Sequence, residues 1–326
     1  MKFAGILQFI FALFLSLLSS ATLAAESSWP SRPVRIIVPF PPGQGADIIA
    51  RLLAQRFSTV FGQPFIVENR PGAGSMIGTT MAARAPADGY TLLMGGTSAL
   101  VINPALYEKL DYDTLRDFAP ISNVAALPML IMVSNSLPIN SISELIKYAK
   151  AHPGKLTYGS AGIGSAHHLI VAKLARMADV QLTHVPYKGS AAPMTDLMSG
   201  RIDILADTLP AAMPSVKAGK VKALAVSSLE RSRYIPDLPT LDESGIPGFD
   251  AVAWSGLLAP RKTPPEILER LSAATKEGLA MPDVQERFKQ LSMQIIGNTP
   301  IEFENFIKLE LDRWRTEVKA ADVKVE

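Results

Sequence analysis

The sequence contains no cysteine. Disulfide bonds are therefore excluded, and a lipid anchor on a mature amino-terminal cysteine is not expected. The fold must instead be stabilised by a packed hydrophobic core. A chain of 326 residues can bury such a core, and chains of this length usually divide into two domains.

An excess of charge is also lacking. The 32 Lys and Arg residues are almost balanced by 30 Asp and Glu residues, and no dense basic run occurs. Such a composition gives no electrostatic basis for binding nucleic acid. Only one apolar run approaches the length of a membrane span, and it lies at the amino terminus. We therefore expect the mature protein to be soluble.

The amino terminus has the three parts of a secretory signal peptide. Lys2 is followed by an apolar run over residues 3–18 and by small residues over 19–25, as signal peptides require. The alternative is a membrane anchor, but a span needs about 20 apolar residues, and this run is shorter and contains Gln8. We predict that residues 1–25 are a signal peptide, with cleavage close to Ala24.

The rest of the chain alternates short apolar strands with amphipathic helices. Residues 34–40, 65–69 and 90–94 are predicted strands, and helical spacing of apolar residues follows the first two. This order implies parallel pairing with right-handed crossovers. Further strands are predicted at 129–134, 156–159, 181–185, 201–206 and 221–227, with helices at 143–151, 165–178 and 191–199.

The tail from Pro264 onward is predicted to be mainly helical, and we expect it to pack on the first half. The first domain is then discontinuous. We predict an α/β fold of two lobes: residues 26–124 plus 250–326 form lobe one, and residues 125–249 form lobe two. The chain crosses between them twice, near residues 120–130 and 247–258, so a hinged cleft is expected.

The most informative stretch, residues 39–47, joins a strand to a helix N-terminus. Unpaired backbone N–H groups and the helix dipole favour an anion there, and Gly43 and Gly45 allow close approach. Asp47 can cap the helix. Ile48 replaces the third glycine of a dinucleotide fingerprint, and the P-loop lysine is missing. The loop therefore suits a small carboxylate better than a nucleotide; the alternative is a tight turn without a ligand.

A second strand-to-helix loop covers residues 158–168. Ser165 is the predicted N-cap, and the hydroxyls of Ser160 and Ser165 could complete a carboxylate cradle. The sequence around Ser160 departs from the G-x-S-x-G nucleophile elbow. His167 and His168 are adjacent, so they cannot chelate one metal together on a helix, and structural or outer roles are expected for both.

A third such loop covers residues 184–190, where Tyr187 and Lys188 offer a hydroxyl and a charge at the rim of the cleft. Asp207 lies at the carboxyl end of a predicted strand, where open α/β sheets place ligands. The alternatives are a surface turn for the loop and a helix cap for Asp207.

Together these loops resemble the substrate-binding proteins of tripartite tricarboxylate transporters, the Bug-type receptors. The resemblance covers nearly the whole mature chain and rests on motifs in a fixed order. They are Trp29-Pro30-x-Arg32-Pro33-Val34, Val38-Pro39-Phe40-Pro41-Pro42-Gly43 with Asp47, Glu68-Asn69-Arg70-Pro71-Gly72-Ala73-Gly74, Ala87-Asp88-Gly89-Tyr90-Thr91-Leu92-Leu93, Tyr158-Gly159-Ser160, Val185-Pro186-Tyr187-Lys188-Gly189, Leu238-Pro239-Thr240 with Glu243-x-Gly245-x-Pro247-Gly248, and Trp254-x-Gly256.

The resemblance implies a periplasmic-binding-protein fold of type II (a Venus flytrap) that closes on a carboxylate in the periplasm. The ligand contacts it implies are Pro42, Gly43, Gln44, Gly45, Ala46, Asp47, Ser98, Ser160, Ala161, Gly164, Ser165, Tyr187 and Asp207. The sequence departs from the family pattern at Gln44, at Ser75-Met76 and at Ile163. Met76 and Ile163 would make the cleft more apolar than is usual in the family.

The sequence thus predicts a monomeric, non-catalytic binding protein without metal or cofactor. It would capture a small carboxylate and deliver it to the membrane subunits of a transporter. Two alternatives remain at this point. One is a periplasmic hydrolase that uses Ser160 or Ser165 with a histidine, and the other is a ligand sensor for a signalling kinase.

Overall fold

The computed structural model describes residues 29–189 and 191–321. The predicted signal peptide, residues 1–25, lies outside the described residues. No helix in the described part of the chain is both long and apolar enough to cross a membrane.

The first sheet begins with parallel strands β1 (Val34–Val38), β2 (Phe65–Asn69) and β3 (Thr91–Gly96). Helix α2 (Gly45–Phe61) connects β1 to β2, and α3 (Met76–Ala83) precedes β3. Ile49, Leu53 and Phe57 are buried at i, i+4 spacing along α2, which explains why this segment forms an amphipathic helix. Gly62 ends it in the left-handed conformation.

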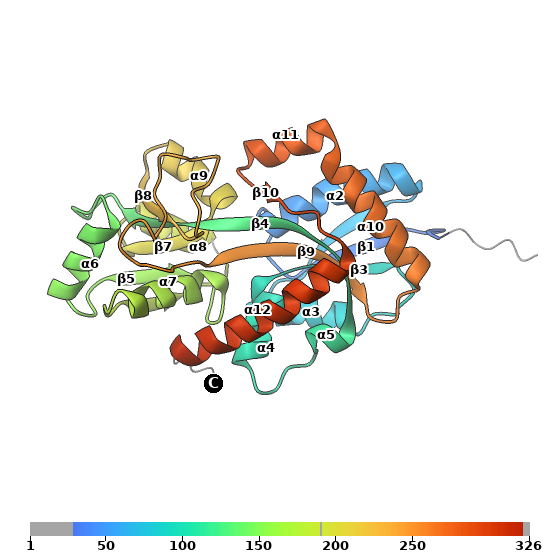
Figure 1. The fold of residues 1–326 in the computed structure, drawn as a ribbon, viewed down its shortest axis with the longest axis horizontal. Helices are drawn as coiled ribbons and strands as arrows, with labels where there is room; N and C mark the ends of the chain where they lie inside the picture. Colours follow the sequence, from blue (N-terminus) through green and yellow to red (C-terminus); the bar gives the residue numbers. More distant parts are fainter. Residues whose placement is uncertain (1–28, 190, 322–326) are drawn as a thin grey trace, which may run out of the picture.

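Strand β4 (Phe118–Ser134) joins the two parts of the molecule. Its residues from Phe118 to Pro128 pair antiparallel with β9 (Val252–Pro260), which itself pairs with β3. Beyond Pro128, β4 pairs with β7 (Ile204–Thr208) and β8 (Val221–Val226) instead. One strand therefore runs through both sheets, as Figure 1 shows.

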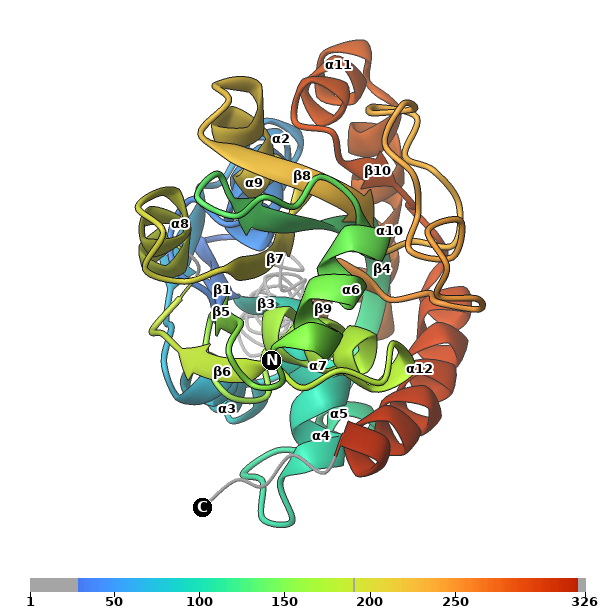
Figure 2. The same ribbon diagram turned by 90° about the vertical axis from the view of Figure 1, so that its left-hand side faces the viewer.

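The second sheet continues from β4 through β7 to parallel strands β5 (Thr157–Ser160) and β6 (Thr183–Pro186). Figure 2 shows helices on both faces of this sheet. Helices α6 and α7 lie on one face and α8 and α9 on the other. Their bounds are Ile142–Ala151, Ala166–Met177, Ala191–Met198 and Leu209–Lys217.

The pleat of β4 divides its side chains between two cores. Met129, Ile131 and Val133 belong to the larger hydrophobic cluster. Leu130 and Met132, which point the other way, belong to a smaller cluster beneath α8 and α9. Both faces of this strand are thus buried, which accounts for its continuous apolar sequence.

The carboxyl-terminal segment forms α10 (Pro265–Ala280), α11 (Pro282–Gln290), the short strand β10 (Gln294–Ile295) and α12 (Pro300–Ala321). As expected, α10 contacts α2 and β4. Helix α12 contacts the π-helical turn η3 (Ser98–Ile102) and α4 (Asn103–Leu106), but it also reaches α7 beside the second sheet.

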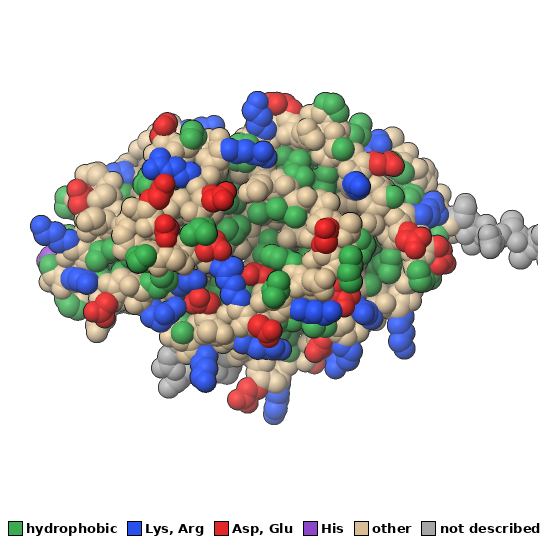
Figure 3. Space-filling view, in the orientation of Figure 1, with side chains coloured by type: hydrophobic (Ala, Val, Ile, Leu, Met, Phe, Trp, Pro, Cys, Tyr) green, Lys and Arg blue, Asp and Glu red, His purple; other side chains and the backbone are tan. Residues whose placement is uncertain are grey.

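Ion pairs mark this second contact of α12. Glu317 lies 2.8 Å from the Lys173 ammonium and 3.0 Å from the Arg176 guanidinium, both on α7. The tail therefore does not pack on the first half alone. Elsewhere charges of both signs are interspersed, as the face in Figure 3 shows.

The predicted strands and helices agree with the structure in type, but no bounds were predicted for the first part of β4, for β9 or for β10. The predicted strand 129–134 is only the second part of β4, whose first part lies where a crossing between the lobes was expected, near residues 120–130. Strand β9 lies where the second crossing was expected, near residues 247–258. The short helices η2 (Ala73–Ser75) and α5 (Thr114–Asp117) complete the described elements near the first sheet. The division into lobes at residues 125 and 250 remains a prediction.

Gly256 provides a test of the seam between β4 and β9. A Cβ atom at this position would overlap the Phe303 ring of α12 and lie 3.0 Å from the Ser122 carbonyl oxygen. We expect Gly256→Ala to lower the free energy of unfolding by about 2 to 3 kcal/mol, because a packed core resists added volume. Thermal unfolding followed by circular dichroism measures the change.

Gly278→Ala is the matched control. Its new Cβ would meet only the flexible Arg56 stem, 3.1 Å away, and alanine is the better helix former. We expect a change within about 1 kcal/mol. Equal destabilisation by both substitutions would contradict the packing argument for Gly256.

Candidate functional site

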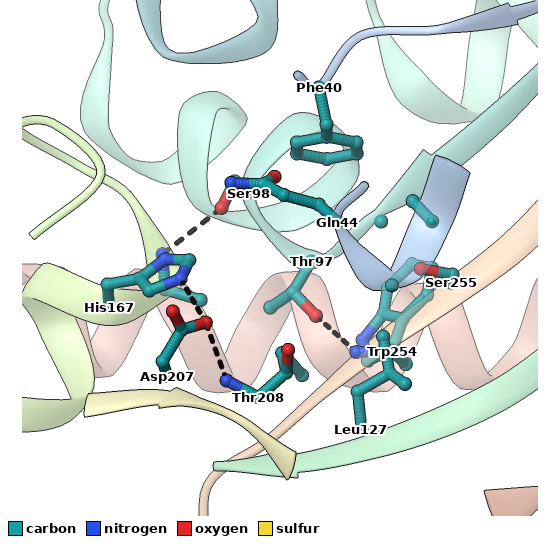
Figure 4. Close-up of a pocket in the computed structure, with 15 residues that line it drawn as sticks. Phe40, Gln44, Thr97, Ser98, Leu127, His167, Asp207, Thr208, Trp254 and Ser255 are labelled. Atoms are coloured by element: carbon teal, nitrogen blue, oxygen red, sulfur yellow. Dashed lines mark hydrogen bonds and ion pairs between the residues drawn. The ribbon is translucent and has the colours of Figure 1, made fainter. Parts of the chain in front are cut away.

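The candidate site is a cavity of about 60 Å³ where the loops of the two sheets meet. The first residues of helix α2 line the cavity, and residues of β3, η3 and β9 form one wall. The start of α7 and the end of β7 supply the opposite wall (Figure 4). The lining residues are Phe40, Gln44, Gly45, Ala46, Gly96, Thr97, Ser98, Leu127, Ala166, His167, Asp207, Thr208, Ala253, Trp254 and Ser255.

The loop before α2 is held by Asp47. Gln44, not Asp47, is the N-cap of α2, and Asp47 sits one turn in. The Asp47 carboxylate accepts hydrogen bonds from the Gly43 N–H, at 2.9 Å, and from Arg51 and Asn69. Burial acts to raise the pKa of Asp47, but these hydrogen bonds outweigh it and lower the pKa below its ordinary value. The Asp47 side chain, which was predicted to contact a ligand, thus holds the loop before α2 in place.

A hydrogen bond crosses the cavity between the two walls. The Ser98 hydroxyl, at the start of η3, accepts the Ala166 N–H from the start of α7 at 3.1 Å. Ser165 is the N-cap of α7, as predicted, and accepts the His168 N–H. The amino terminus of α7 is thereby attached to a loop that follows β3.

Three aromatic rings stack beneath the loop between β5 and α7. The His168 and His184 rings lie 3.9 Å apart, and Tyr158 lies 4.8 Å from His184. Burial lowers the pKa of His168 to about 3, helped by His184, and burial lowers the pKa of His184 to about 4. Both imidazoles are therefore neutral near pH 7.

Ser160 is attached to this stack. Its Oγ lies 2.6 Å from Nε2 of His184 and accepts the Gly162 N–H at 3.1 Å. The residue is fully buried, and Ser165 donates its hydroxyl to the Gly162 carbonyl. Both hydroxyls hold the loop, so neither is presented to the cavity as a nucleophile.

His167 and Asp207 form an imidazole–carboxylate pair in the cavity wall. Nε2 of His167 lies 3.1 Å from Oδ1 of Asp207, and that oxygen also accepts the Thr208 N–H at 2.7 Å. Nδ1 of His167 is buried and has no hydrogen-bond partner among the described residues. Figure 4 shows the His167 ring between Ser98 and Asp207.

The structure brings only some of the predicted ligand contacts to the cavity. Gln44, Gly45, Ala46, Ser98 and Asp207 line it. Pro42, Gly43 and Asp47 lie beside it in the same loop, and Ser160, Ala161, Gly164 and Ser165 form the loop above the aromatic stack. The Tyr187 hydroxyl donates to Asp196 on α8, at 2.6 Å, and not into the cavity. The complete set of contacts remains a prediction.

Several lining residues were not predicted. Trp254 and Ser255 come from β9, whose position depends on pairing between distant segments. Thr97 accepts the Trp254 N–H and fixes this wall. His167 was expected to have a structural or outer role, but it lines the cavity. One feature of the sequence indicated that His167 could line the cavity: it lies in the first turn of a helix that follows a predicted binding loop.

Comparison with known proteins identifies the family. Residues 49–323 match the model of the tripartite tricarboxylate transporter family receptor. The chain belongs to this receptor family. The prediction made from its ordered motifs is confirmed.

Relatives of the receptor support the same conclusion. Protein BugT of Bordetella pertussis is 33% identical over 97% of this chain and 98% of its own. The structure of R. palustris Rpa4515 with adipate is 36% identical, covers 91% of this chain and 99% of its own, and has a TM-score of 0.87. The structure of MatC from Rhodopseudomonas palustris with bound malate is 34% identical and has a TM-score of 0.84. The match covers 89% of this chain and 100% of that chain.

These likenesses confirm the predicted two-lobed periplasmic-binding-protein fold of the receptor. The family is one of solute-binding receptors and periplasmic proteins. Its members are receptors rather than enzymes, in agreement with the buried hydroxyl of Ser160.

The histidine stack predicts a loss of stability in acid. Because the folded pKa values of His168 and His184 lie below the ordinary value near 6.5, the unfolded chain takes up protons first as the pH falls. Their contribution is complete above pH about 6.5 and is lost as the pH falls towards 4 and then 3. Between pH 7 and pH 5 we expect a loss on the order of 2 kcal/mol per ring, with a fall in Tm of several degrees.

His168→Gln should remove roughly half of this fall in Tm between pH 7 and pH 5, measured by thermal unfolding of the ligand-free receptor. His152→Gln, at the carboxyl end of α6, is the matched control and should leave the pH dependence unchanged. An equal fall in Tm for the wild type and His168→Gln would show that the stack is not its source.

Proposed function

We propose that this receptor captures a small organic carboxylate in the cavity and delivers it to the membrane subunits of a tripartite tricarboxylate-type transporter. The observation that carries the proposal is the amino terminus of α2 in the cavity wall, where Gly45 and Ala46 are lining residues. The first N–H groups of a helix have no partner within it, and they attract an anion.

The composition of the wall supports a small organic acid. Phe40, Leu127 and Trp254 provide an apolar surface for a carbon skeleton, and Ser98, Thr208 and Ser255 provide polar groups. Solved structures of similar proteins contain adipate and malate. We infer that a ligand of this class fits the cavity here, held mainly by backbone N–H groups and hydroxyls.

The architecture supports capture by closure. In the proposed division, residues 26–124 and 250–326 form one lobe and residues 125–249 the other, joined by β4 and the segment that leads into β9. A ligand that contacts both lobes stabilises the closed arrangement. Cleavage after the signal peptide in residues 1–25 would release the receptor into the periplasm, where it acts as a monomer.

The proposal is tested by isothermal titration calorimetry with a panel of mono-, di- and tricarboxylates that includes adipate and malate. We expect at least one acid to bind with a Kd that is micromolar or tighter. If no acid in the panel binds, the proposed function is wrong.

Ser98→Ala tests closure itself. The substitution removes the acceptor of the Ala166 N–H, which joins the two walls. One lost hydrogen bond between the lobes should weaken binding of the best acid by about 5- to 10-fold.

Ser143→Ala, at an exposed position on α6, is the control and should bind as the wild type does. An unchanged Kd for Ser98→Ala would show that this bond does not contribute to the ligand-bound state.

A further inference from the structure

The cavity that is proposed to receive an anion contains no fixed positive charge in its lining. Asp207 is the one carboxylate among the lining residues, and no Lys or Arg lines the cavity. The Asp207 side chain is only 3% exposed, so water screens its charge weakly. A carboxylate ligand would meet this charge unless a lining group gained a proton.

His167 is the lining group that can do so. Because Nε2 faces the Asp207 carboxylate at 3.1 Å, that nitrogen carries the hydrogen and donates it. Nδ1 is then either a bare acceptor or, in the imidazolium, a second donor. It is buried without a partner among the described residues, so a ligand oxygen reaches it only when the ring or the wall around it moves on binding. A buried polar group of this kind is stabilised when a ligand supplies the partner.

We propose that His167 is the cationic contact of the ligand, and that it takes up one proton from solvent as the carboxylate binds. In the bound state Nε2–H donates to Asp207 and Nδ1–H donates to the ligand carboxylate. The imidazolium then lies between two carboxylates, and the cavity receives the anion together with a proton. This inference rests on the proposed function, because it assumes a carboxylate in the cavity.

The other histidines are unsuited to this role. His168 and His184 stack outside the lining, and burial holds their pKa values at about 3 and about 4. They therefore stay neutral between pH 6 and pH 8. His152 lies at the end of α6 and is not among the lining residues.

Several charged groups on the elements packed around His167 are paired with one another. On α2, Asp47 lies 2.9 Å from Arg51. On α7, Lys173 and Arg176 pair with Glu317. Behind Trp254, Glu310 accepts the indole N–H at 3.1 Å and pairs with Arg313. Among the lining residues, His167 and Asp207 form the titratable pair.

The test uses the whole mature receptor with adipate and malate as probes. At pH 7, calorimetry in phosphate and in Tris gives the number of protons taken up, because the two buffers differ in ionisation enthalpy. We expect between about half a proton and one proton per ligand. The Kd should rise with pH between pH 6 and pH 8, with a slope approaching tenfold per pH unit.

His167→Gln keeps a hydrogen-bonding side chain but cannot carry the charge. We expect weaker binding at pH 6, no proton uptake and a Kd independent of pH. His152→Gln should retain the proton uptake of the wild type. Proton uptake that persists in His167→Gln would place the proton elsewhere, for example on Asp207, and would overturn the proposal.

A spectroscopic measurement on the wild type keeps the proposal testable if His167→Gln fails to fold. Imidazole 15N NMR at pH 7 should show both ring nitrogens of His167 protonated once adipate or malate is bound. A neutral ring in the complex, or a Kd that does not vary between pH 6 and pH 8, would overturn the proposal while leaving the proposed function intact. Absence of binding by any carboxylate from pH 5 to pH 8 would instead refute the proposed function.

Discussion

The antiparallel pairing of β4 with β9 is the constraint on which the rest of the molecule depends. The pairing extends from Phe118 opposite Pro260 to Pro128 opposite Val252. It closes the first sheet, because β9 also pairs with β3, and it carries β4 onward into the second sheet. Trp254 and Ser255 reach the cavity wall only because this ladder places them beside the loop that follows β3.

Much of the fold could be predicted from local sequence patterns. The parallel strands β1 and β2 coincide with short, mainly apolar runs, and turn residues and caps such as Gly62 and Ser165 mark the ends of helices. Strand β9 and the first part of β4 could not be predicted in this way. Both are buried along almost their whole length and contain glycine or proline, so neither shows the alternation that identifies a strand. Their pairing across the chain overrides the weak local preference.

The site was predictable to the extent that it is made of strand-to-helix loops. Gly45, Ala46 and Asp207 occupy positions where α/β folds place ligands, and these residues line the cavity. Ser160 and Tyr187 do not line the cavity, because each hydroxyl has a partner inside the protein. The place of His167 in the cavity lining was not predicted, because its partner Asp207 lies on a strand that is distant in sequence and adjacent in space.

The place of β9 also affects how the chain can fold. Leu93 of β3 pairs with Leu258, about half the chain later, so the first sheet lacks an interior strand until that segment is available. Contacts of such high sequence separation slow folding, because the entropic cost of closing the loop comes before any stabilisation by strand pairing. A chain that emerges from its amino terminus would expose the unpaired edge of β3 for most of its synthesis. Because the first sheet cannot be completed until β9 has been synthesised, the incomplete chain does not reach its native state early.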